Sequence, residues 1–166
     1  MKWLTVVLLT LPSISAQTNA CKSALVTLQR DETVAAFGYA SGVGFFMDTV
    51  RGSSVGKTLA DCPGLADTAW NTILKTGRDS SKALPSAFTA DRTAVLLTIY
   101  GEQLSSTNFQ KLKEFVRLKP WEHGFLFASD IAIDALLAYE KDPSRDTRYH
   151  SYTKDEMEAA LQKYAR

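Results

Sequence analysis

The sequence predicts an all-α fold, a compact bundle of six or seven helices with one disulfide. Apolar residues recur at intervals of three and four positions through most of the chain, which is the spacing of an amphipathic helix. Short polar stretches with Gly or Pro separate these segments, and alternating β-branched runs are few. The length of 166 residues suits one such domain.

In the first third of the chain, the pattern predicts a short helix over residues 22–29 and a longer one over residues 31–50. Asp31 lies where an acidic side chain favours the positive end of the second helix. Residues 51–61 are rich in Gly and Ser, and we expect a loop there.

Three amphipathic helices are expected in the middle of the chain. The first of these helices begins at about Pro63, since proline suits the first turn of a helix, and we expect it to stop at Gly77. Two more cover residues 91–101 and 107–118, and Pro120 ends the last of them.

Residues 125–139 are apolar almost all round, which is typical of a helix at the centre of a bundle. Pro143 interrupts the chain after this segment. Thr153 followed by Glu156 is a capping box, and it predicts a last amphipathic helix.

The amino terminus has the order of a secretory signal peptide: Lys2, then an apolar run over residues 3–11, then small residues ending at Ala16. We expect cleavage after Ala16, which leaves a single helical domain over residues 17–166 in the periplasm or outside the cell. No later apolar stretch approaches the ~20 residues that span a bilayer, so no membrane anchor is expected after cleavage.

The only two cysteines, Cys21 and Cys62, both lie in the part of the chain expected to be exported. An oxidising compartment favours a disulfide between them. Cleavage after Ala20 is the alternative, and it would leave Cys21 first for lipid attachment. Two thiols are too few for a closed zinc site, and we expect no metal and no other cofactor.

The charge balance argues against nucleic-acid binding. The chain has 19 basic and 18 acidic residues, and removal of the signal peptide takes away one lysine, so the mature protein is neutral. The Gly-rich stretch at residues 52–58 has three residues between its glycines, whereas a phosphate-binding loop needs four. No motif with correct spacing for catalysis remains.

Two acidic residues form a possible site on the apolar segment. Asp130 and Asp134 are four residues apart, so both carboxylates lie on one side of the predicted helix. Together with Glu122 and His123 they form an alternative hydrolytic site with acidic and histidine groups. The other interpretation is that basic side chains from a neighbouring helix neutralise the two aspartates.

The polar stretch that follows Pro143 is a possible protein-binding surface. Arginine and tyrosine are the residue types that dominate protein interfaces. A solvated connector is the other interpretation of the same stretch. The candidate binding residues are Arg145, Arg148, Tyr149, His150 and Tyr152.

Residues 20–76 resemble small helical periplasmic proteins that act as immunity proteins to type VI secretion toxins. The resemblance is carried by Gly38-Tyr39, Gly42-Val43 and Cys62-Pro63, in that order; Ala36 stands close to where the family usually has a cysteine. It implies a domain that binds a toxic enzyme and blocks it, without catalysis of its own.

The sequence therefore predicts an exported, non-enzymatic protein-binding domain, with an immunity or inhibitor role against a toxin or enzyme as its most specific form. Two alternatives stay open. One is a small exported hydrolase that uses the acidic and histidine residues, and the other is a secreted effector that acts on a host protein.

Overall fold

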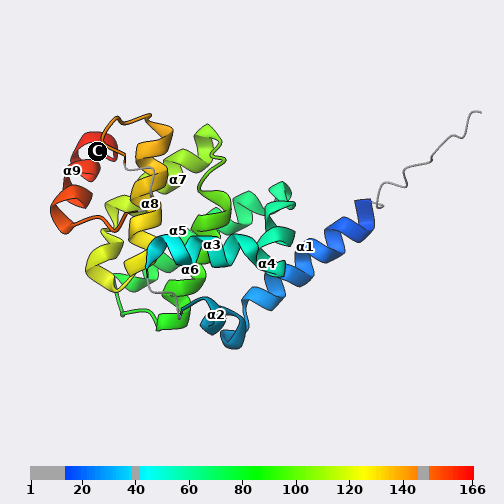
Figure 1. Cartoon of the computed structure of the whole chain (residues 1–166). Coiled ribbons are helices and arrows are strands. Elements are labelled where there is room, and N and C mark those ends of the chain that lie inside the picture. The colour runs from blue at the N-terminus through cyan, green and yellow to red at the C-terminus, as the bar shows by residue number, and fades with distance from the viewer. Residues whose placement is uncertain (1–13, 39–41, 146–149) are drawn as a thin grey trace, which may run out of the picture.

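The computed structural model describes residues 14–38, 42–145 and 150–166, and every regular element in these ranges is a helix (Figure 1). The all-α prediction is confirmed, with more and shorter helices than the six or seven expected. The described helices are α1 (Ile14–Leu28), α2 (Asp31–Gly38), α3 (Val43–Gly52), α4 (Ser54–Ala60), η1 (Pro63–Leu65), α5 (Ala66–Ser80), α6 (Ala87–Tyr100), α7 (Ser106–Arg117), η2 (Pro120–His123), α8 (Leu126–Tyr139) and α9 (Lys154–Tyr164), where η marks a 3₁₀ helix. None of these helices has the length and apolar character of a membrane span.

Helices α6 and α8 pack against each other at the centre of the bundle, with α2 to α5, α7 and α9 packed around them, whereas α1 packs on α2 and α4 (Figure 1). The central position predicted for residues 125–139 is confirmed. Most side chains of both helices are buried, so neither has one polar face. Trp70, Phe46, Phe115 and Phe125 are completely enclosed in the core around them. Enclosing each of the three phenylalanine side chains stabilises the fold by about 1.5–3 kcal/mol.

Helices α5 and α7 lie side by side on the central pair. The sequence predicted that α5 stops at Gly77, and this prediction is wrong, because the helix continues to Ser80. Gly77 lies inside the helix, at its contact with α7. A Cβ atom at Gly77 would lie 2.9 Å from Cδ2 of Phe115. The glycine therefore serves close helix packing here.

The loop predicted over residues 51–61 is wrong, because α4 occupies most of it. Ser53 caps this helix: its hydroxyl accepts a hydrogen bond from the Gly56 amide. Leu59 is fully buried, and Val55 packs against the core beside it. Burial of these two side chains outweighs the poor helix propensity of the surrounding Gly and Ser residues.

The single helix predicted over residues 31–50 is also corrected, since α2 ends at Gly38 and α3 begins at Val43. Tyr39, which carries part of the resemblance, lies outside the described residues. Gly38 allows the close approach of a neighbour, because a Cβ there would lie 2.9 Å from Oδ2 of Asp91 on α6.

Helix α1 starts earlier than the predicted residue 22, and its first turns extend away from the rest of the molecule (Figure 1). The expected cleavage point after Ala16 falls within it, and residues 1–13 of the predicted signal peptide lie outside the described residues.

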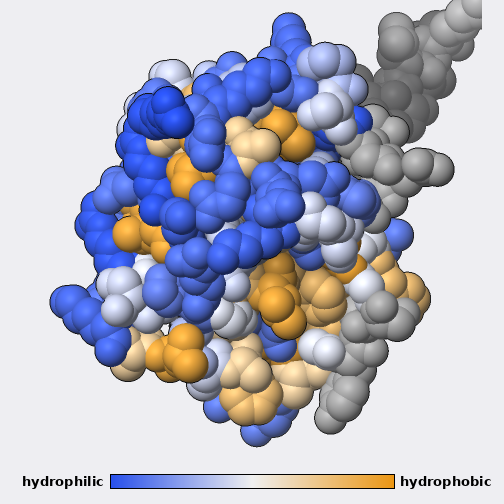
Figure 2. Space-filling model, turned by 90° about the vertical axis from the view of Figure 1, so that its left-hand side faces the viewer, coloured by the Kyte–Doolittle hydropathy of each residue, from blue (hydrophilic) through white to orange (hydrophobic). Residues whose placement is uncertain are grey.

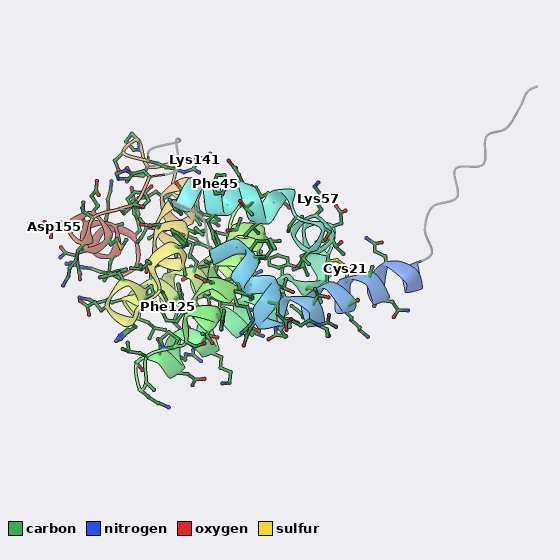
Figure 3. All side chains as sticks on the ribbon, turned by 60° about the horizontal axis from the view of Figure 1, so that its bottom comes forward. Cys21, Phe45, Lys57, Phe125, Lys141 and Asp155 are labelled. Carbon is green, nitrogen blue, oxygen red and sulfur yellow. A yellow bond between two sulfur atoms is a disulfide. The ribbon has the colours of Figure 1, made fainter. Side chains whose placement is uncertain are left out.

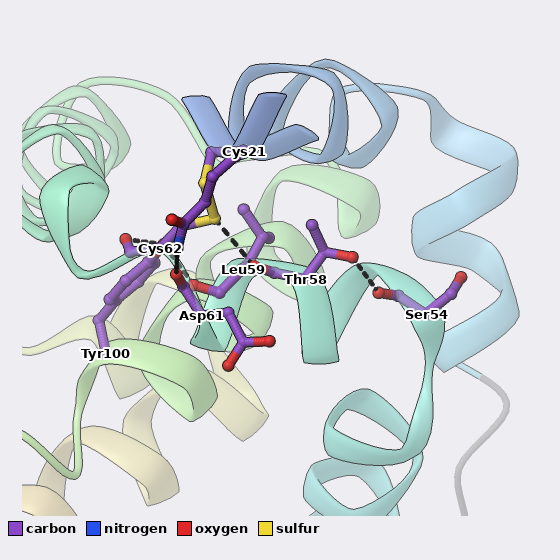
Figure 4. Close-up of a disulfide and its surroundings, with 8 residues drawn as sticks. Cys21, Ser54, Thr58, Leu59, Asp61, Cys62 and Tyr100 are labelled. Atoms are coloured by element: carbon purple, nitrogen blue, oxygen red, sulfur yellow. Dashed lines mark hydrogen bonds between the residues drawn. A yellow bond between two sulfur atoms is a disulfide. The ribbon is translucent and has the colours of Figure 1, made fainter. Parts of the chain in front are cut away.

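The predicted disulfide between Cys21 and Cys62 is confirmed, and it ties α1 to the junction of α4 and η1 (Figure 4). The hydroxyl of Tyr100 reaches the same junction from α6. It donates to the carbonyl oxygen of Leu59 at 3.1 Å and lies 3.4 Å from that of Cys62. The end of α4 is thus fixed both covalently and by hydrogen bonds to the central helix.

Candidate functional site

The two aspartates of α8 hold the stretch of chain that follows Pro143. Asp134 accepts two hydrogen bonds from Arg145, at 2.9 Å from Nε and 2.8 Å from Nη2. This two-point geometry is the strongest form of an arginine–carboxylate pair. The hydroxyl of Tyr152 lies 3.4 Å from the same carboxylate, so Asp134 contacts both ends of the stretch from residue 145 to residue 152.

Asp130 lies one turn earlier on α8 and is 7% exposed. Its Oδ1 accepts a hydrogen bond of 2.8 Å from the backbone amide of Tyr152. Burial raises the pKa of the Asp130 carboxyl above its usual value, and hydrogen bonds from Tyr152 and Ser151 act in the opposite direction. The carboxylate therefore fixes the chain just before α9.

The interpretation in which a basic side chain neutralises the acidic pair is thus supported for Asp134, in altered form. The basic side chain that neutralises Asp134 comes from the loop after α8 and not from a neighbouring helix. The acidic pair and the loop are two separate candidates in the sequence, and the structure joins them into one network. We call residues 142–145 and 150–152, which the structure describes at the two ends of this loop, the anchored segment.

A second cluster fastens the start of the anchored segment to α9. Asp142 follows a left-handed turn at Lys141, and its side chain is 3% exposed. Its carboxylate accepts hydrogen bonds from the amide and the hydroxyl of Ser144, from Lys163 at 2.7 Å, and from the hydroxyl of Tyr164. The ammonium of Lys163 holds the pKa of Asp142 well below its usual range, and Ser144 and Tyr164 add to the effect.

This cluster was missed in the sequence analysis. The Asp142-Pro143-Ser144 triplet does contain a signal for part of it, because an aspartate often accepts from the amide two residues later. Nothing in the local sequence indicates that Lys163 and Tyr164, more than twenty residues away, complete the cluster.

Helix α9 supports the other end of the anchored segment, and its predicted capping box between Thr153 and Glu156 is confirmed. Glu156 also lies 3.5 Å from Nε2 of His150, whose ring meets that of Tyr152 edge to face. Hydrogen bonds from Thr153 lower the pKa of Glu156, which keeps this carboxyl ionised. Figure 3 shows Lys141 and Asp155, which flank the segment in the chain, on the side of the molecule away from Cys21.

A hollow of about 310 Å³ lies between the anchored segment and α9. Asp142, Ser144, Tyr152 and Glu156 contribute polar groups to it, and Leu137 contributes an apolar wall. Neither Asp130 nor Asp134 lines this hollow. The two aspartates lie outside the hollow and hold the segment through their hydrogen bonds with Arg145 and Tyr152.

Glu122 and His123 belong to η2 and do not join the network. Glu122 pairs with Lys154 at 3.5 Å, and this contact links η2 to the first turn of α9. Within the described part of the chain, His123 has no hydrogen bond or ion pair. The alternative hydrolytic site is thus split between α8 and η2, and among the described residues no hydrogen bond or ion pair joins Glu122 or His123 to the two aspartates.

Of the five predicted binding residues, the structure describes Arg145, His150 and Tyr152 and brings all three to the same end of the molecule. Arg148 and Tyr149 lie outside the described residues. The described His, Cys, Asp and Glu side chains include no group of three or more that is arranged to hold a metal ion.

Comparisons of the chain with protein-family models, with curated proteins and with solved structures find no match. The resemblance of residues 20–76 to immunity proteins thus remains a prediction from the sequence.

Proposed function

We propose that this protein is an exported, non-enzymatic binding domain that binds another protein through the anchored segment and through residues 146–149, which join its two parts in the sequence. The observation that carries the proposal is the use of Asp130 and Asp134 as anchors for the two ends of the segment. Two carboxylates that the sequence offered for catalysis are engaged in holding a loop.

Anchoring supports binding for a thermodynamic reason. A loop that must be ordered on association loses conformational entropy, and this loss weakens the complex. Contacts of Asp130, Asp134 and Asp142 fix the described parts of the segment before any partner arrives. Sequence supplies the interface chemistry, since Arg148 and Tyr149 fall between the anchored ends.

The more specific proposal is an immunity or inhibitor role, in which the partner is a toxic enzyme. An anchored segment with arginine, tyrosine and histidine suits insertion into the cleft of such an enzyme. This step depends on the resemblance described above and on the predicted export of the chain.

A hydrolase is the second candidate, and one observation favours it. Asp130 is buried and its pKa is raised, which is a property of carboxyl groups that act as general acids. Its hydrogen bond to the Tyr152 amide and the separate location of His123 favour the binding proposal instead.

The test is affinity capture followed by measurement of the dissociation constant. The oxidised mature protein is immobilised and exposed to envelope and secreted fractions of the producing organism and of organisms that live beside it. Binding of the retained protein is then compared for the wild type, for R148A/Y149A, and for R30A/V26A as a matched control. Val26 is exposed on α1 and Arg30 is exposed just after it, and α1 lies at the opposite side of the molecule from α9 (Figure 1).

We expect one retained protein. Its dissociation constant should rise by about thirtyfold or more in R148A/Y149A, because two interface anchors are lost, and should stay unchanged in the control. Equal binding by the wild type and the two variants would overturn the proposal that Arg148 and Tyr149 contact the partner. Conversion of a substrate by the wild type, lost in D130N and H123A, would establish the hydrolase instead.

A further inference from the structure

Asp91 is a half-buried carboxyl group in a hollow that neither the anchored segment nor the disulfide region uses. The hollow has a volume of about 320 Å³ and lies where the end of α2, the first turns of α6 and the start of α8 meet. Its lining residues are Gly38, Ala87, Ala90, Asp91, Gly124, Leu126 and Phe127.

The hollow exists because most of its lining residues have small side chains or none. The carboxylate of Asp91 occupies the space above Gly38, where a Cβ atom would lie 2.9 Å from Oδ2. Gly124 has a φ of 80°, a left-handed conformation that favours glycine, so the wall on this side carries no side chain. Phe127 forms a firm apolar wall, since its ring lies 5.0 Å from that of Phe46 in the core.

Asp91 receives no hydrogen bond and no ion pair from the residues that the structure describes. Its neighbour Arg92 is engaged elsewhere, with the carbonyl oxygens of Leu28 and Gln29 and with the carboxylate of Asp31. Burial raises the pKa of the Asp91 carboxyl because the charged form loses water without gaining a cation. Among the described residues, the hollow therefore combines apolar walls with one acidic group that no described cation neutralises.

Apolar surface continues outside the hollow. Leu126 is 73% exposed at its rim, and Phe88, next to Ala87 in the chain, is 38% exposed. Figure 2 shows apolar side chains along the lower edge of the face that α8 and α9 occupy. Exposed apolar surface beside a polar group is typical of a place where another molecule binds.

From these observations we infer that the Asp91 hollow accepts a basic side chain, lysine or arginine, from a partner protein. The long aliphatic stem of such a side chain covers Ala87, Ala90 and Leu126, and its positive head reaches the carboxylate of Asp91. An anionic or phosphate group is excluded by the charge of Asp91. The inference concerns the chemistry of a second contact and deepens the binding proposal above, on which the identity of the partner as a protein rests.

The test uses small probes, so that it does not depend on finding the partner. N-acetyl-lysine methylamide and N-acetyl-arginine methylamide are titrated into the oxidised protein while the backbone amide signals of Gly38 and Gly124 are followed by NMR. The citrulline analogue serves as an uncharged probe of the same length as arginine, and the norleucine analogue as an uncharged probe that lacks only the terminal nitrogen of lysine. The variants are D91N and, as a control, D48N, because the Asp48 side chain is 72% exposed on α3.

We expect saturable shifts at both glycines with the basic probes, in the millimolar range. The neutral probes and the D91N variant should bind at least about tenfold more weakly, while D48N should behave as the wild type. Equal shifts with norleucine would reduce the hollow to a non-selective apolar surface and overturn the inference. Unchanged binding in D91N, or no saturable shift with any probe, would overturn it as well.

Three further outcomes identify the occupant and separate this inference from the proposed function. Sedimentation velocity of the wild type and D91N over a range of concentrations identifies a second copy of the chain as the occupant if only the wild type associates, and that result would exclude a different partner. Failure of the capture experiment together with successful probe binding would count against the proposed function alone. Capture of a partner with unchanged affinity in D91N would count against this inference alone.

Discussion

The guanidinium of Arg145 binds the carboxylate of Asp134 through two parallel hydrogen bonds, across eleven residues of chain. The pair joins the last turns of α8 to the loop that follows. The Asp134 side chain is 14% exposed and that of Arg145 is 31% exposed, so water screens the pair only in part.

We predict that D134N and R145A each destabilise the fold, and that their effects are not additive. Because the pair is partly exposed, a coupling energy of about 1 kcal/mol is expected, below the several kcal/mol of a fully buried pair. A double-mutant cycle from urea unfolding measures this coupling. Purely additive effects would show that the pair does not hold the loop in solution.

The stability difference between D130N and the wild type should depend on pH, with a sign that follows from the raised pKa of Asp130. A carboxyl whose pKa is higher in the folded than in the unfolded protein favours folding most at low pH, and this contribution is lost as the pH rises through the folded pKa. Asparagine has no such titration. The stability of D130N relative to the wild type should therefore increase from about pH 3 to about pH 7.

Urea unfolding of both proteins at several pH values checks this prediction, because all other carboxyl groups are common to the two proteins and cancel. A constant difference would mean that Asp130 titrates alike in the folded and unfolded chains. A difference that changes in the opposite direction would mean that the hydrogen bonds from Tyr152 and Ser151 outweigh burial.

Replacement of both cysteines, C21S/C62S, should lower the free energy of unfolding by about 4 kcal/mol or less, because the disulfide closes a loop across 41 residues. The far-ultraviolet circular dichroism should stay helical, since α1 also packs against α2 and α4. Urea unfolding of the oxidised wild type and of the variant measures the difference. An unchanged midpoint of unfolding would show that loss of the disulfide does not increase the conformational entropy of the unfolded chain enough to lower stability.

The variant G77A should destabilise the fold by about 1–3 kcal/mol, although alanine favours helices, because its new methyl group has no room beside Phe115. Gly52 is the matched control. It ends α3, and a Cβ built there meets none of the described atoms within 4 Å. Thermal unfolding of the two variants compares an added methyl in a crowded and in an open position, and equal effects would refute the close α5–α7 contact.

The sequence predicts the parts of the fold that local chemistry determines. The capping box of Thr153 and Glu156 fixes the start of α9, and the all-round apolar segment fixes α8 as a central helix. The wrong loop prediction for the residues of α4 arises because tertiary packing, and not local chemistry, determines the structure there. Ser53, Ser54 and Gly56 have weak helix propensity, and burial of Leu59 and Val55 against the assembled core makes the segment helical.

In the candidate site too, local sequence predicts some features, and others depend on contacts between distant parts of the chain. The spacing of Asp130 and Asp134 correctly predicts two carboxylates on one side of a helix. Their partners depend on the path of the chain after Pro143, which is set by contacts with α9 that the sequence does not reveal. Asp142 is the clearest case, since Lys163 and Tyr164 reach it only after α9 has packed on the bundle.

The disulfide also determines how the domain responds to mechanical force. Residues 17–20 are exposed on the part of α1 that extends from the body, and Cys21 is the first buried residue after them. A pull on Gln17 passes through the covalent link from Cys21 to Cys62 and bypasses the chain between the two cysteines. The packing of α1 on α4 therefore carries little of the tension, and the domain resists being peeled open from this end.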